Sequence, residues 1–207
     1  MKNLNTYIQE NTCINEKLVI THYKSYSCAP ETEQELRDII KERLEKDPDA
    51  DLNDIDVSNI THMSDLFWGL DPGNIDISEW DVSNVEDMHD MFYCCDYFNS
   101  DLSRWDVSNV KNMEGVFFKC KNFNSDLSNW DVSKVRDMSG MFYSCEKFDS
   151  DLSEWDVSKV QDMHNMFYYC ESFNSDLNSW DVSNVKNMKF MFNGCVSMKK
   201  LPEWYVK

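Results

Sequence analysis

The chain has 207 residues, with 20 Lys and Arg against 38 Asp and Glu, and a formal net charge of −18. This balance argues against nucleic acid and anionic membranes as partners, because both attract clustered Lys and Arg. Hydrophobic residues make up 42% of the chain and aromatic residues 14%, which can supply a core and argues against disorder. No stretch approaches the roughly 18 consecutive apolar residues of a membrane span.

Residues 1–30 form an N-terminal segment in which no signal peptide is visible. Residues 1–15 have one Lys before a polar run and no apolar stretch. This pattern predicts a cytoplasmic or phage-associated protein, unless a leader was removed. Residues 18–26, with the sequence LVITHYKSY, are rich in β-branched and aromatic residues, so we expect a strand there.

A capping helix is predicted at residues 31–47. Thr32 and Glu35 form a capping box, and apolar residues follow at helical spacing until Asp47 and Pro48 end the pattern. We expect one apolar face of this helix to cover the open end of the region that follows.

Residues 48–198 contain a repeat with a spacing of 25 residues. Its most regular element is the tetrapeptide WDVS, which begins at Trp80, Trp105, Trp130, Trp155 and Trp180. A fixed period of about 20 to 50 residues is typical of stacked identical units, none of which buries its apolar face alone. The predicted fold class is therefore a repeat solenoid, a leucine-rich-repeat-like right-handed coil.

Each repeat is expected to contain a strand and a short helical turn. Residues Leu102–Val107 match the leucine-rich-repeat strand pattern and predict a parallel β-strand face. The apolar stripe in Val110–Cys120 predicts a helical turn, with Ser108 as its N-cap. Residues 199–207 predict a C-terminal capping strand, because Pro202 and neighbouring Lys side chains block further pairing.

Five of the eight cysteines recur in the repeat, at Cys95, Cys120, Cys145, Cys170 and Cys195. One Cys at the end of each apolar pattern is typical of a small buried side chain, so we expect free thiols there. The redox state of Cys13, Cys28 and Cys94 is left open by the sequence.

The repeat unit FNSDLSxWDVSNVxxMxxMFxxC, preceded by ELRDIIKERLEKDPDADLNDIDVSNITHM, resembles the BspA-like leucine-rich-repeat surface proteins of bacteria and mycoplasmas. The resemblance covers about residues 31–207. It implies a non-enzymatic short-repeat solenoid, displayed on cell surfaces and associated with adhesion or binding to host proteins. Members of that family usually carry a signal peptide or lipoprotein anchor, and no such segment is visible in this sequence.

A candidate binding face lies on the exposed side of the predicted strands, where an Asp follows each Trp and a variable residue precedes it. By the two-residue alternation of a strand, both point away from the core. The candidate residues are Glu79, Asp81, Arg104, Asp106, Asn129, Asp131, Glu154, Asp156, Ser179 and Asp181. A fixed scaffold with variable exposed positions is how solenoids present a binding surface. Sequence drift at solvated positions is the alternative.

The repeated Asp residues have two interpretations. Backbone N–H groups and Ser hydroxyls can hold them, or they can form a stripe that binds cations or a basic partner. No calcium-loop, nucleophile-elbow, phosphate-loop or zinc motif occurs, so no cofactor, metal ligand or catalytic residue is predicted. His89 and His164 share a position in the repeat but lie three repeats apart, too far to share a metal ion.

The predicted function is a non-enzymatic scaffold that mediates protein–protein interaction, as an adhesin or partner-binding protein, through this face. A basic protein is one candidate partner. The alternative is a structural or virion-associated spacer of a bacteriophage without a specific ligand, since the N-terminal residues resemble the short leaders of gut bacteriophage proteins. The sequence leaves the ligand, the oligomeric state and the source open.

Overall fold

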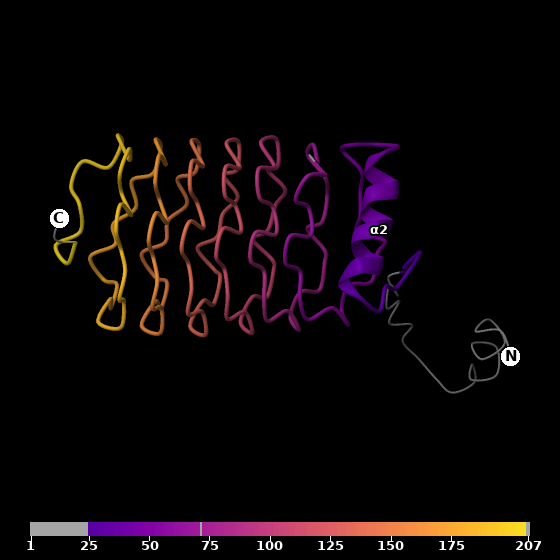
Figure 1. The fold of residues 1–207 in the computed structure, drawn as a ribbon, viewed down its shortest axis with the longest axis horizontal. Helices are drawn as coiled ribbons and strands as arrows, with labels where there is room; N and C mark the ends of the chain where they lie inside the picture. The colour runs from indigo at the N-terminus through magenta and orange to yellow at the C-terminus, as the bar shows by residue number, and fades with distance from the viewer. Residues whose placement is uncertain (1–24, 71, 206–207) are drawn as a thin grey trace, which may run out of the picture.

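The computed structural model describes residues 25–70 and 72–205. Within these ranges the single helix is α2, Glu33–Leu44, and β-pairing is confined to isolated parallel bridges. The repeats lie side by side along the long axis, and α2 lies at the N-terminal end of the row (Figure 1). Of the strand predicted at residues 18–26, only residues 25 and 26 are described. These two residues form no β-strand or β-bridge.

The helix α2 covers the first repeat with an apolar face. Thr32 is its N-cap, and the Thr32 Oγ1 accepts the Glu35 N–H at 3.2 Å. Leu36, Ile40 and Leu44 are buried and join the core of the repeats. The helix lies within the range predicted for it. No helix in the described ranges has the length and hydropathy that crossing a bilayer requires.

Arg37 on α2 occupies the backbone edge of the first repeat. Its guanidinium donates to the Leu66 carbonyl at 2.6 Å and also to the Trp68 carbonyl. In the second repeat the Met91 carbonyl, equivalent to that of Leu66, accepts the N–H of Phe67 instead. The side chain of Arg37 therefore replaces a preceding repeat as the donor to these carbonyls.

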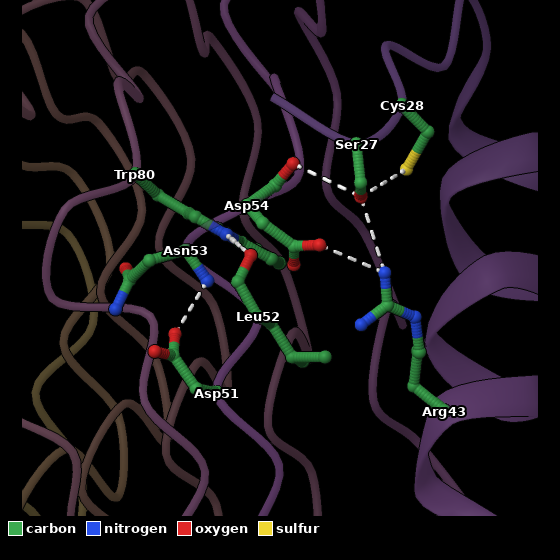
Figure 2. Close-up of polar contacts among 8 residues, drawn as sticks. All are labelled: Ser27, Cys28, Arg43, Asp51, Leu52, Asn53, Asp54 and Trp80. Carbon is green, nitrogen blue, oxygen red and sulfur yellow. Dashed lines mark hydrogen bonds and ion pairs between the residues drawn. The ribbon is translucent and has the colours of Figure 1, made fainter. Parts of the chain in front are cut away.

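A second set of polar contacts joins the segment before α2 to the first repeat. The Arg43 Nη2 lies 2.9 Å from the Asp54 Oδ2 and 3.1 Å from the Ser27 Oγ, as Figure 2 shows. The Ser27 hydroxyl donates to the Asp54 carbonyl at 3.2 Å, and Cys28 forms a parallel bridge with Ile55. The helix is thus fixed by its apolar face and by ion pairing near its end.

The main backbone ladder between repeats lies in the segment that was predicted to be a helical turn. Alternate N–H groups donate to the next repeat, from Met88, Asp90, Phe92 and Cys94 to the carbonyls of Asn112, Glu114, Val116 and Phe118. Of the intervening N–H groups, those of Met91 and Tyr93 donate to the carbonyls three residues back, and that of His89 donates to the Asp87 Oδ1. The helical turn was therefore a wrong prediction, because half of the N–H groups leave the segment. This alternation uses positive φ angles, 51° at Asp90 and 62° at Cys94.

Turns also replace the strands that the sequence predicted. In residues 102–107 the Trp105 N–H donates three residues back at 3.1 Å, so it is not available for lateral pairing. In residues 199–205 the Tyr205 N–H donates to the Pro202 carbonyl at 3.0 Å. The predicted strand face and C-terminal capping strand are therefore turns in the described residues. The Trp105 N–H is used within its own turn, whereas the Leu102 N–H donates to the Ser125 Oγ of the next repeat at 2.9 Å.

The Trp of each repeat is buried and hydrogen-bonded to the repeat before it. Trp130 is 3% exposed, and its Nε1 donates to the Leu102 carbonyl at 3.0 Å. The same carbonyl accepts the Trp105 N–H at 3.1 Å, so both lone pairs of one oxygen are used. The prediction that the Trp row lies in the core is confirmed.

The repeated Cys residues likewise share a carbonyl acceptor with a backbone N–H of the preceding repeat. The Cys145 Sγ donates to the Phe117 carbonyl at 2.9 Å, and that carbonyl also accepts the Cys120 N–H. Cys120, Cys145 and Cys170 are free thiols with no exposed surface. Burial raises the pKa of each of these thiols well above its usual value, so they remain protonated donors. Their predicted burial is confirmed.

Replacing Trp130 with Phe tests the hydrogen bond that joins two repeats. The variant keeps an aromatic ring but loses the donor to Leu102 and leaves a small gap, so we expect the free energy of unfolding to fall by about 1–3 kcal/mol. Urea unfolding followed by circular dichroism measures the change. The matched control is Trp68→Phe, whose native side chain is 54% exposed. Equal losses in both variants would show that the Trp130 hydrogen bond contributes nothing.

Candidate functional site

All ten residues of the predicted binding face are exposed. We call this surface the Asp face, defined by Glu79, Asp81, Arg104, Asp106, Asn129, Asp131, Glu154, Asp156, Ser179 and Asp181. It lies on turns rather than on extended strands. The variable residues alternate along the stack between acidic, basic and neutral side chains, so the face has no uniform charge outside its Asp row.

Each Asp of this face accepts a hydrogen bond from the backbone N–H of the Ser two residues later. The Asp131 Oδ1 accepts the Ser133 N–H at 3.0 Å, and the Asp81 Oδ1 accepts both the N–H and the hydroxyl of Ser83. Hydrogen bonds from the side chain and backbone of Ser108 lower the pKa of Asp106. These contacts agree with the interpretation in which nearby backbone N–H groups and Ser hydroxyls hold the Asp carboxylates.

The two repeated histidines each contact an Asp in their own repeat. The Nδ1 of His164 lies 2.8 Å from the Asp162 Oδ1, and the Nδ1 of His89 lies 3.1 Å from the Asp87 Oδ1. Partial burial acts to lower the pKa of His89, but the hydrogen bond and charge of Asp87, together with the charges of Asp65 and Asp90, outweigh it and raise the pKa. Among the described residues, no group of three or more His, Cys, Asp and Glu side chains is arranged to hold a metal ion.

The structure brings together a row of surface aromatic residues that the sequence reasoning missed. We call it the aromatic ladder, consisting of Trp68, Tyr93, Phe118, Tyr143 and Tyr168. From Tyr93 to Tyr168, the centroids of successive rings are 4.6, 4.4 and 4.8 Å apart, and the ring planes are nearly parallel. The signal was present, because these residues follow the buried Phe row by one position. It was obscured because the ring type changes from repeat to repeat.

A groove of about 150 Å³ runs beside the aromatic ladder. Its lining consists of Asp90, Tyr93, Glu114, Gly115, Phe118, Ser139, Gly140, His164 and Asn165. The φ angle of Gly115 is 58°, and a Cβ at this position would lie 1.9 Å from the Asp90 Oδ1. Burial raises the pKa of Asp90 and of Glu114, with a further contribution from neighbouring carboxylates. The lining of the groove therefore combines aromatic rings with carboxylates.

Two substitutions at Asp131 separate the interpretations of the Asp row. Asn keeps an oxygen for the Ser133 N–H, so we expect Asp131→Asn to change the free energy of unfolding by less than about 0.5 kcal/mol. Asp131→Ala removes the acceptor and should cost about 1 kcal/mol. Millimolar calcium should leave the melting temperature of both the native protein and Asp131→Asn unchanged. A calcium-dependent rise that disappears in Asp131→Asn would show a cation site instead.

The acidic groups predict a stability maximum at mildly acidic pH. Turn hydrogen bonds lower the folded-state pKa of Asp106 and Asp126, so their stabilisation is complete above the unfolded value of 3.8 and is lost as the pH falls through the folded values. Burial raises the pKa of Asp90 and Glu114, so their ionised forms destabilise the fold at neutral pH.

Protonation of Asp90 and Glu114 should therefore raise the melting temperature slightly between pH 7 and about pH 5, and relief of the overall negative charge acts in the same direction. Below the unfolded Asp value the melting temperature should fall. Thermal unfolding between pH 2.5 and pH 8 measures the profile. A melting temperature that rises continuously down to the acid limit would contradict the assigned turn hydrogen bonds.

The chain was compared with protein families, curated proteins and solved structures. No curated protein and no solved structure matches it. A family model described as "Mycoplasma protein of unknown function, DUF285" matches residues 35–144 and, in an overlapping second match, residues 115–207. These ranges include α2 from residue 35 onward and every repeat that carries the WDVS tetrapeptide. The protein therefore belongs to the DUF285 repeat family of Mycoplasma-type proteins.

Proposed function

We propose that the protein is a non-enzymatic repeat scaffold that binds another protein through its lateral surface. The fold class in this proposal is a leucine-rich-repeat-like solenoid, and the finer family assignment is to BspA-like surface proteins. The parallel bridges from Asp87 to Asn112 and from Asn112 to Asp137 support a solenoid, because they join equivalent positions of consecutive repeats. The repeat motif and the DUF285 match support the family assignment.

The aromatic ladder and its groove carry the proposal. Aromatic side chains are enriched in protein interfaces, because they bury a large area with few rotatable bonds. Phe118 and Tyr143 stack face to face at 4.4 Å, so the edges of the rings are the surface open to a partner. Trp68 extends this surface at the N-terminal end, with 54% of the residue exposed.

The charge around the groove favours a partner with basic residues. Asp90 and Glu114 line the groove, and Asp65 contributes to the raised pKa of Asp90. A Lys or Arg side chain placed there would neutralise these carboxylates and contact the aromatic rings through its aliphatic part. The Asp face is the second candidate surface, but its Asp carboxylates already accept hydrogen bonds within their turns, as at Asp131.

A comparison of bait proteins tests the proposal. The native chain, the double variant Trp68→Ser with Glu114→Arg, and the double variant Arg104→Glu with Glu154→Lys are used to capture proteins from lysate, with quantification by mass spectrometry. We expect the first variant to capture at least about tenfold less of a specific partner than the native chain does. A tenfold decrease corresponds to a loss of about 1.4 kcal/mol of binding free energy. The second variant changes only the Asp face and should bind as the native chain does.

Each other outcome has a defined meaning. Loss confined to the Arg104→Glu and Glu154→Lys variant would assign binding to the Asp face. A set of captured proteins that is the same for all three baits would contradict specific binding through the lateral surface and favour a spacer without a ligand. Equal melting temperatures of the baits are required, and all four substituted side chains are exposed in the native chain.

A further inference from the structure

Basic side chains gather at one corner of the repeats, in the three-residue segment that follows the WDVS tetrapeptide. These segments read NVK at residues 109–111, KVR at 134–136, KVQ at 159–161 and NVK at 184–186. Their cations, all of them exposed, are Lys111, Lys134, Arg136, Lys159 and Lys186. None of the four segments contains Asp or Glu, although the chain as a whole carries a net charge of −18. This corner is therefore basic on an acidic protein.

Cations of this corner reach back to the equivalent position of the preceding repeat. The Lys111 Nζ lies 2.7 Å from the Glu86 Oε2, and the Lys186 Nζ donates to the Gln161 Oε1 at 2.9 Å. A cation here is thus satisfied when the residue 25 positions earlier offers it an oxygen.

Arg136 and Lys159 have no such oxygen. The residue 25 positions before Arg136 is Lys111, and the one before Lys159 is Lys134. The Arg136 N–H donates to the Lys111 carbonyl at 2.8 Å, so these two like charges begin from paired backbone positions. Like charges in adjacent positions of this kind repel each other. In the described part of the chain, neither Arg136 nor Lys159 forms an ion pair.

The carboxylates beside these two cations are held by other donors. The Asp137 Oδ1 accepts the N–H and the hydroxyl of Ser139, and the Asp156 Oδ1 accepts the Ser158 N–H at 3.0 Å. Hydrogen bonds from Ser158 are the main cause of the lowered pKa of Asp156, and the charge of Lys159 contributes less. These carboxylates therefore moderate the positive charge of the corner without neutralising it.

The uncompensated cations line one open cavity of about 380 Å³. We call it the basic basin, defined by Arg136, Lys159, Gln161, Asn184 and Lys186. Its lining contains no carboxylate and comes from three consecutive repeats, and it shares no residue with the groove beside the aromatic ladder. The Gln161 Oε1 is already occupied by Lys186, which leaves the Gln161 Nε2 as a further donor. Its volume lies at the lower end of small-ligand sites, which is about 300–1,000 Å³.

We propose that the basic basin binds a phosphate group, either as the free anion or as a monoester carried by another molecule. The planar guanidinium of Arg136 donates to two phosphate oxygens, and the ammonium groups of Lys159 and Lys186 neutralise the remaining charge. A bound dianion also offsets the repulsion between Arg136 and Lys111. A long polyanion such as nucleic acid is a poorer complement, because the protein beyond this corner is acidic.

Calorimetric titration of the 207-residue chain with sodium phosphate, at about pH 7.5 and low ionic strength, tests the inference. We expect one saturable site per chain. Arg136→Gln and Lys159→Gln should each weaken binding at least about tenfold, because each removes a donor and a positive charge. Arg136→Lys keeps the charge but not the planar fork, so its loss should be smaller, about threefold.

The matched control removes the same charge outside the basin. Lys121 pairs with Asp96 and does not line the basin, so Lys121→Gln should change phosphate affinity by less than about twofold. Arg136, Lys159 and Lys121 are all exposed, and we expect these variants to keep the melting temperature of the native chain within a few degrees.

Two further titrations identify the form of the ligand. Phosphate is mainly a monoanion at about pH 5.5, because its second pKa is about 6, whereas sulfate stays a dianion. Phosphate binding should therefore weaken on going from about pH 7.5 to about pH 5.5 relative to sulfate binding. Blocked phosphoserine that binds at least as tightly as inorganic phosphate would identify a monoester as the ligand, and binding of inorganic phosphate alone would identify the free anion.

Three results would overturn the inference. The first is the absence of saturable phosphate binding. The second is equal weakening by Lys121→Gln and Arg136→Gln, which would show a diffuse charge effect. The third is an affinity for chloride equal to that for phosphate, which would show that the basin does not select a dianion.

Discussion

Each repeat is held to the one before it by side-chain donors that share a carbonyl with a backbone turn. The Leu102 oxygen accepts the Trp105 N–H and the Trp130 Nε1, and the Phe117 oxygen accepts the Cys120 N–H and the Cys145 Sγ. A carbonyl oxygen has two lone pairs, so both devices leave the buried acceptor satisfied. The turn supplies the first donor and the next repeat supplies the second. The fixed repeat length and the presence of Trp and Cys in each repeat therefore serve one requirement, which is that each side-chain donor reaches a buried carbonyl of the preceding repeat.

The same logic accounts for a fold with little regular secondary structure. The Ser150 Oγ accepts the Leu127 N–H of the preceding repeat at 2.9 Å, and the Asp126 Oδ1 accepts the Ser128 N–H at 3.0 Å. Backbone groups at the corners are thus paired by short polar side chains rather than by long strands. Since each corner needs its Asp or Ser, repetition of these residues reflects backbone satisfaction. It does not by itself identify a functional site.

Positions at which the repeats differ are therefore better candidates for a functional site. Along the aromatic ladder the ring type changes from repeat to repeat while the rings remain stacked, as Tyr93 and Phe118 do. Beside them, the absence of a side chain at Gly115 leaves room for the Asp90 carboxylate of the preceding repeat. At the first repeat, the Arg37 side chain of α2 donates to the Leu66 carbonyl in place of a preceding repeat.

The sequence by itself determined the period, the buried rows that contain Trp130 and Cys145, and the position of α2. These follow from apolar phase and capping chemistry, which act within a few residues. It did not determine the backbone path of residues 102–120. Apolar spacing of three and four residues suits a helical turn and also suits successive turns that face a core, so the pattern alone cannot choose between them. Only the neighbouring repeat supplies the carbonyls that draw alternate N–H groups out of the segment, as the Glu114 carbonyl does for Asp90, whose φ angle is positive. The aromatic ladder is likewise a product of stacking, because Phe118 and Tyr143 become neighbours through the tertiary structure alone.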